Sequence, residues 1–122
     1  MNKPTTKNRI NLRCNRRGTV NIVENIVGVI EYPLAIHRSV DEHEDILDGR
    51  RKRHSDRWNI THLPTGKGLG IKTSDWESII GYVKDIGEHP CLLMMTDETM
   101  TQHPMYRDLV DKHSEARKKW KL

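Results

Sequence analysis

The hydrophobic period of this chain changes once, near residue 74, and that change limits the folds open to it. Before it, short runs alternate apolar and polar residues, as in "INLRCNRR" (10–17) and "RWNITHL" (57–63). After it, apolar residues recur at the three- and four-residue spacing of one helix face: Trp76, Ile79, Ile80 and Val83. A period of two predicts half-buried strands, and a period of 3.6 predicts amphipathic helices. Strands are therefore expected first and helices after them.

Four or five antiparallel strands are expected before residue 73. The candidate strands alternate or are rich in β-branched residues, and they span 10–17, 18–32, 34–40, 57–63 and 69–72. The alternation slips at Glu24-Asn25, which predicts a bulge or a turn inside the second run.

The glycine-rich stretch "PTGKGLG" (64–70) raises the question of a phosphate-binding loop. Such a loop needs Ser or Thr after Gly-Lys and a helix directly behind it. Here Gly68 follows Lys67, and the helical pattern starts only at Ser74. A hairpin turn explains the residues more simply, with Pro64 at its second position and Gly66 at positive φ. Lys67 at the tip stays a candidate for contact with a ligand phosphate.

Two helices are expected after the strands. "SDWE" (74–77) has the pattern of a capping box with Ser74 as N-cap, and Gly87 ends that helix. A second helix is expected over 103–122 with Pro104 near its first turn, and residues 90–95 fit either a strand or a short helical turn.

The predicted fold is α+β: an antiparallel sheet of four to five strands with two C-terminal helices packed on one face. The length of 122 residues is typical of a single domain over 1–122. Residues 1–72 would form the sheet, with a charged loop at 41–57, and residues 73–122 the helical part.

Composition excludes several classes of protein. No apolar run approaches the ~20 residues that a membrane span needs, so no membrane association is expected. Cys14 and Cys91 are isolated and lack metal-site spacing, which favours reduced thiols in the cytoplasm. Because only 34% of the residues are hydrophobic, we expect some apolar surface to be buried in a homo-oligomer.

The seven histidines invite metal or acid–base hypotheses, but no pair has the His-x-x-x-His spacing of a helical zinc site. We therefore expect no metal, no cofactor and no enzymatic activity. A two-histidine phosphodiesterase is the enzymatic alternative, because "HRSV" (37–40) matches half of its motif. "HLPT" (62–65) has its Thr one position too late, and strand phase places His37 and His62 on opposite faces of the sheet.

An anionic ligand, either a nucleotide or nucleic acid, is the partner that the charge pattern favours. Residues 1–23 hold six Lys and Arg and no acid. One set of apolar side chains is expected to face the helices: Ile10, Leu12, Cys14, Leu34, Ile36, Trp58 and Ile60. The opposite face would then gather Asn11, Arg13, Asn15, His37, Ser39, Arg57, Asn59 and Thr61. An ordinary solvated sheet face has the same pattern.

The residues that we predict to bind the anion are Arg13, Arg16, Arg17, His37, Arg57, Asn59 and Lys67. No aromatic residue lies on the polar face, which argues against a single strand held by base stacking. Binding of a duplex by the basic N-terminal region, or of a nucleotide in a pocket, stays open.

The order of "LAIHRSV" (34–40), a charged insert, "WNITHLPTGKGL" (58–69) and a capped helix resembles a layout in small uncharacterised phage-encoded accessory proteins. The resemblance covers residues 34–87 and implies an accessory protein that acts by binding, with a counter-defence or host-takeover role. It carries over no functional residue. The alternative is a protein–protein inhibitor of a host or immune effector, with the charged loop 41–57 and the last helix as contacts.

Overall fold

The computed structural model describes residues 2–38 and 57–122, except for the side chain of Arg16. Ser39 and most of the predicted charged loop, residues 41–56, therefore lie outside the described residues.

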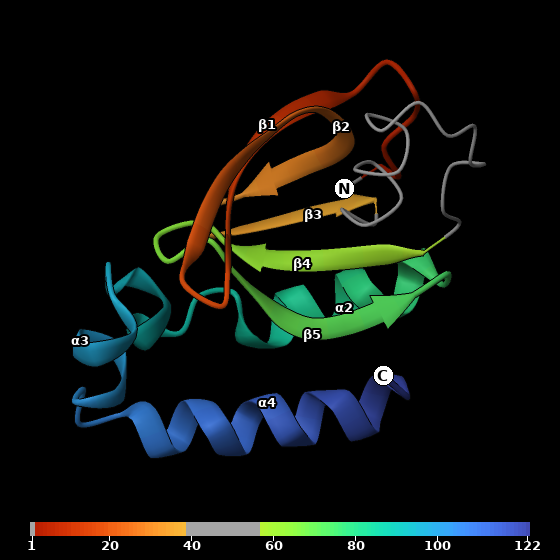
Figure 1. Ribbon diagram of the computed structural model, residues 1–122. Helices are drawn as coiled ribbons and strands as arrows, with labels where there is room; N and C mark the ends of the chain where they lie inside the picture. The colour runs from red at the N-terminus through yellow and green to blue at the C-terminus, as the bar shows by residue number, and fades with distance from the viewer. Residues whose placement is uncertain (1, 39–56) are drawn as a thin grey trace.

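Five antiparallel strands pair in chain order and form one sheet, as the α+β prediction requires. The strands are β1 (Arg9–Arg16), β2 (Thr19–Glu31), β3 (Leu34–Arg38), β4 (Trp58–His62) and β5 (Lys67–Thr73). The helical part consists of α2 (Trp76–Ile86), the 3₁₀ turn η1 (Pro90–Leu93), α3 (Asp97–Thr101) and α4 (Tyr106–Trp120). Figure 1 shows α2 against β4 and β5, with α4 as an outer layer that packs on α2.

The predicted irregularity in the second strand is a β-bulge. The pairing of β1 with β2 shifts between Ile10 and Leu12, and Asn25 opposite them adopts a φ of 57°. The Asn25 N–H donates to Asn11 Oδ1 at 3.1 Å, which holds the extra residue in place. Because of this shift, Val23 and Ile26 are buried in the same cluster although they are three residues apart.

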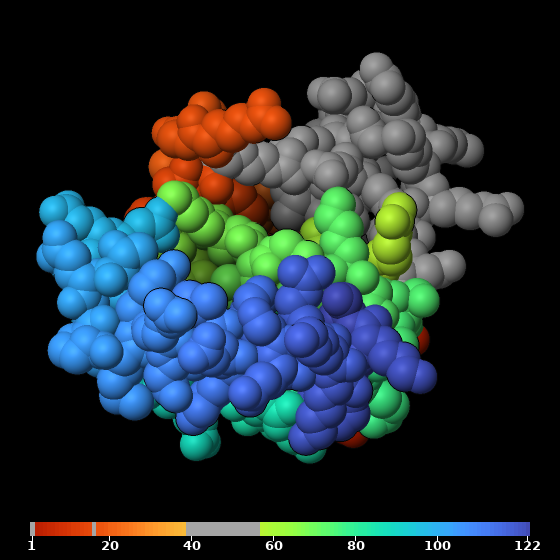
Figure 2. Space-filling view, turned by 90° about the horizontal axis from the view of Figure 1, so that it is seen from below, coloured from red at the N-terminus to blue at the C-terminus, as the bar shows by residue number. Residues whose placement is uncertain are grey.

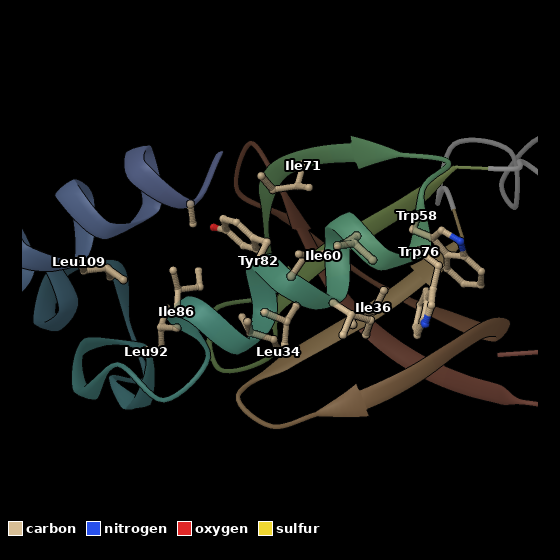
Figure 3. Close-up of a cluster of buried hydrophobic side chains, with 14 of the residues drawn as sticks. Leu34, Ile36, Trp58, Ile60, Ile71, Trp76, Tyr82, Ile86, Leu92 and Leu109 are labelled. Carbon is tan, nitrogen blue, oxygen red and sulfur yellow. The ribbon is translucent and has the colours of Figure 1, made fainter. Parts of the chain in front are cut away.

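The main core lies between the sheet and the helices, as predicted. Alternate residues of β3 and β4 point into it, together with one face of α2, as Figure 3 shows for Leu34, Ile36 and Ile60. Trp58 and Trp76 meet edge to face with their ring centroids 5.0 Å apart. These two indoles supply much of the aromatic volume in a chain without Phe.

A second core occupies the opposite face of the sheet and corrects one prediction. Ile10, Leu12 and Cys14 were expected to face the helices, but they pack with Val23, Ile26 and Ala35. Ala35 lies between Leu34 and Ile36 on β3, so its side chain points away from the helices. The sheet curls, and the β1–β2 hairpin crosses over that far face (Figure 1).

The helix boundaries differ from the sequence predictions at two places. Asp75, not Ser74, is the N-cap of α2, and its Oδ1 accepts from the Glu77 N–H. The last helix begins at Tyr106, after Pro104. The ambiguous segment at 90–95 contains the 3₁₀ turn, and Gly87 ends α2 as expected. Among the residues that the structure describes, no helix combines the length and the apolar character needed to cross a membrane.

Candidate functional site

The turn after β4 is a hairpin, and it also anchors the far edge of the sheet. Gly66 adopts the predicted positive φ, at 72°. Its carbonyl accepts from the Asn15 N–H at 2.8 Å, so the end of β1 reaches across to the β4–β5 turn. A Cβ on Gly66 would lie 2.8 Å from the Arg13 carbonyl oxygen, which leaves no space for a side chain. This contact closes one end of the curled sheet.

Next to this contact, a cavity of about 200 Å³ lies in the seam between β1 and β5. Asn15 of β1 lines one wall, and Gly68 and Lys72 of β5 line the other. His37 of β3 and Asn59 and Thr61 of β4 form the floor. We call this the seam cavity. It gathers Asn15, His37, Asn59 and Thr61 from the predicted polar face.

His37 is fixed in the floor as a neutral group. Its side chain is 1% exposed, and Nδ1 lies 2.6 Å from the Arg38 carbonyl oxygen, which can only accept. Nδ1 therefore carries the proton, and Nε2 accepts from the Thr61 hydroxyl at 2.7 Å. Burial lowers the pKa of His37 to about 4. His37 was predicted to contact the anion, but both ring nitrogens are occupied, so it positions Thr61 instead.

Asn59 has a buried hydrogen-bond acceptor in this floor. Its Oδ1 has no hydrogen-bond partner within the described parts of the chain, 2–38 and 57–122. A buried carbonyl without a donor costs about 1–3 kcal/mol. Gly68 leaves open space beside the floor, because a Cβ there would meet no atom closer than the Ile60 carbonyl oxygen at 3.8 Å. The cavity therefore offers Asn59 and room for a group that donates to it.

Cationic side chains lie on the same side of the sheet as Asn59. Lys72 of β5 is the direct cross-strand partner of Asn59 and lines the cavity. Arg57 is exposed and precedes Asn59 by two residues, which gives it the same parity along the strand. No Asp or Glu is present among the described residues that line the cavity. The described lining of the cavity therefore carries positive charge at Lys72.

The other predicted anion-binding residues lie elsewhere. Arg13 and Arg17 are exposed, and Arg13 alternates with the buried Leu12 and Cys14, which puts it on the outer face of β1. Lys67 forms an ion pair with Asp97 of α3. The predicted polar face is therefore not one continuous surface, because the curl of the sheet buries part of it and turns part of it outward.

Sequence reasoning missed Lys72 and Gly68 as cavity residues. The strand pattern placed 69–72 opposite 57–63, but register decides which residues share a face. In the structure the β4–β5 pairing shifts between Asn59 and Thr61, and Gly70 adopts a φ of 70° beside the shift. A glycine inside a strand pattern was the available signal for such a bulge.

The geometry of a two-histidine phosphodiesterase is not formed. His62 points toward the helices, where Nε2 donates to the Leu92 carbonyl oxygen at 2.6 Å and Nδ1 accepts from the Thr65 hydroxyl at 2.8 Å. His37 points to the opposite face, as the strand phase predicts. The two rings cannot flank one phosphate.

Within the described residues, no group of three or more His, Cys, Asp or Glu side chains is placed to hold a metal ion. Comparison with protein-family models, curated proteins and solved structures finds no match to this chain.

Proposed function

We propose that this chain is a non-enzymatic binding protein that holds a small anionic ligand of the nucleotide class in the seam cavity. The observation that carries the proposal is the buried Asn59 carbonyl, which has no donor among the described residues and belongs to the lining of a cavity of about 200 Å³. An N–H of a nucleobase would supply that donor. Lys72 and Arg57 would favour the phosphate of the same ligand, since charge-assisted hydrogen bonds are the stronger ones.

The size of the cavity favours a mononucleotide over a polymer. A volume of about 200 Å³ holds one ring system, with the phosphate at the mouth. Capture of a nucleotide signal would suit the accessory, counter-defence role that the resemblance to phage-encoded proteins implies. That role is supported by the resemblance of residues 34–87, not by the cavity.

An acidic protein partner is the second candidate, because the outer face of the β1–β2 hairpin mixes positive charge with exposed apolar groups. Ile22, directly opposite Arg13 in the register, is 61% exposed, and Val20 is 49% exposed. Exposed apolar side chains beside arginine are typical of protein interfaces. None of Arg13, Val20 and Ile22 lines the seam cavity, so the two candidates can be tested separately.

The test is native mass spectrometry of the protein as purified from cells, followed by titration with the common ribonucleoside monophosphates. Binding would be compared among the wild type, Asn59→Ala, Gly68→Ala and the outer-face control Arg13→Ala. Asn59→Ala removes the acceptor, and Gly68→Ala places a methyl group in the open space. We expect each to weaken binding about tenfold or more, while Arg13→Ala leaves it unchanged.

Circular dichroism of each variant separates loss of binding from loss of fold. Gly68 has no positive φ and no crowded neighbour, so its alanine variant should melt at the wild-type temperature or above. If Asn59→Ala and Gly68→Ala bind as the wild type does while Arg13→Ala fails, the seam cavity is not the site. The outer face of the hairpin would then be the binding surface.

A further inference from the structure

A second cavity, of about 250 Å³, lies on the other side of the sheet, among the β4–β5 turn, α2, η1, α3 and α4. We call it the helix cavity. Figure 2 shows α3 and α4 covering this side of the molecule, with β4 and β5 emerging beside them. The main core contributes its deep wall, where Tyr82, Ile86, Leu92 and Leu109 come together (Figure 3).

The walls of the helix cavity are mostly apolar. Ile86 and Leu92 are almost fully buried, and Leu69, Met100 and Leu109 complete the lining from β5, α3 and α4. An enclosed cavity of about 150 Å³ lined by Leu, Ile and Phe accepts benzene. The helix cavity is large enough for one substituted ring.

Few polar groups of this lining are open to a ligand. Both nitrogens of His62 are bonded within the protein, to Leu92 and Thr65. Lys67 and Asp97 pair with each other, so the charges that they bring to the lining compensate. Neither an anion nor a cation is favoured there.

Two tyrosines also belong to the lining, Tyr106 and Tyr82, and the Tyr82 side chain lies fully buried at the deep wall. Its hydroxyl lies 2.5 Å from His113 Nδ1, and both residues line the cavity. Burial raises the pKa of Tyr82 and lowers the pKa of His113, so both groups are neutral at pH 7. Whichever of the two donates, the Tyr82 oxygen keeps one further hydrogen-bonding site. A ligand hydroxyl can use that site in either case, because it both donates and accepts.

We infer that the helix cavity is a binding site for a small neutral ring compound that carries one hydroxyl, and that the Tyr82–His113 pair recognises the hydroxyl. The apolar walls hold the ring, and the paired Lys67 and Asp97 offer no unbalanced charge that would attract a charged relative. Its lining shares Gly68 with that of the seam cavity, but the inference does not depend on the anion proposed there.

The test uses two probes of nearly equal shape, 4-fluorophenol and 4-fluorotoluene, with binding measured by ¹⁹F NMR. The wild type should bind 4-fluorophenol about fivefold more tightly, since one hydrogen bond separates the probes. Tyr82→Phe should remove that preference and keep the binding of 4-fluorotoluene. Val110→Trp, at a 41% exposed lining position, should weaken both, and the seam-cavity variant Asn59→Ala should change neither.

Three results would overturn the inference. Equal binding of the two probes to the wild type would show that the hydroxyl is not recognised. A preference for 4-fluorophenol that survives Tyr82→Phe would place the recognition elsewhere. If neither probe binds a wild-type protein that is folded by circular dichroism, the helix cavity is a packing void and not a site.

Discussion

At the scale of single residues, three histidines serve as neutral hydrogen-bonding groups in the interior. His37 links β3 to Thr61 of β4, His62 links β4 to η1, and His113 links α4 to Tyr82 of α2. Desolvation by burial lowers the pKa of each. Desolvation therefore favours the unprotonated form of each ring in the folded protein.

The burial of His37 predicts a loss of stability in mild acid. Its pKa is about 4 in the folded state against 6.5 for the free side chain, so the unfolded chain takes up the proton first as the pH falls. The contribution is complete above pH 6.5 and is lost progressively down to pH 4. Between pH 7 and 5 we expect the free energy of unfolding to fall by about 2 kcal/mol from this residue.

Urea denaturation at pH 7 and 5 checks this, with His37→Gln as the comparison. Gln can still bond to Thr61 but does not titrate, so the variant should lose less stability on acidification. The lowered pKa values of His62 and His113 act in the same direction, so the free energy of unfolding should still fall somewhat with pH in both proteins. If the free energy of unfolding falls by the same amount in the two proteins between pH 7 and 5, His37 does not contribute to the pH dependence.

At the scale of elements, the contact of α2 with α4 depends on a glycine inside a helix. Gly81 lies in the middle of α2, and a Cβ there would approach the Trp120 ring to 2.3 Å. Trp120 Nε1 also donates to Asp85 Oδ2 at 2.8 Å, one turn further along α2. The missing side chain thus allows the indole to lie directly on the helix, although glycine costs about 1 kcal/mol in a helix interior.

A double-mutant cycle separates these two effects. Gly81→Ala alone should destabilise the protein by about 1–2 kcal/mol, because displacement of the indole outweighs the gain in helix propensity. In a Trp120→Ala background the same change should stabilise by up to about 1 kcal/mol, since only the propensity gain is left. Thermal or urea unfolding of the four proteins gives the coupling. An equal effect in both backgrounds would refute the contact.

The elements themselves were largely predictable from sequence, because their signals are local. Residues close in sequence were enough to predict four features: the alternation of the strands, the bulge at Asn25, the hairpin at Gly66 and the end of α2 at Gly87. The start of α2 was off by one residue, since Ser74 and Asp75 are both good caps and propensity does not choose between them.

At the scale of the whole molecule, the side of the sheet on which a strand buries its apolar residues could not be predicted. Alternation shows that Leu12 and Cys14 share a face, but it does not say which side of the sheet that face covers. The answer depends on the curl, which comes from bulges and from the contact of β1 with a turn some fifty residues away. The sequence therefore predicted only part of the lining of the seam cavity. Asn59 and His37 belong to this lining, but Arg13 does not.

That long-range contact yields a prediction with a built-in control. Gly66 and Gly70 both have positive φ, at 72° and 70°. A Cβ on Gly66 would collide with the β1 backbone at Arg13, whereas a Cβ on Gly70 would meet nothing within 4 Å. Gly70→Ala should therefore cost only the backbone strain, about 1–2 kcal/mol. Gly66→Ala should cost the same strain plus the loss of the β1 contact.

Hydrogen exchange distinguishes the two variants at one amide. The Asn15 N–H donates to the Gly66 carbonyl oxygen, so it should exchange much faster in Gly66→Ala and at the wild-type rate in Gly70→Ala, once both rates are corrected for global stability. Because the same contact closes the end of the seam cavity, Gly66→Ala should also weaken the nucleotide binding proposed for that cavity. If the Asn15 amide stays protected in Gly66→Ala, β1 is held against the sheet by its other contacts, and the turn does not shape the cavity.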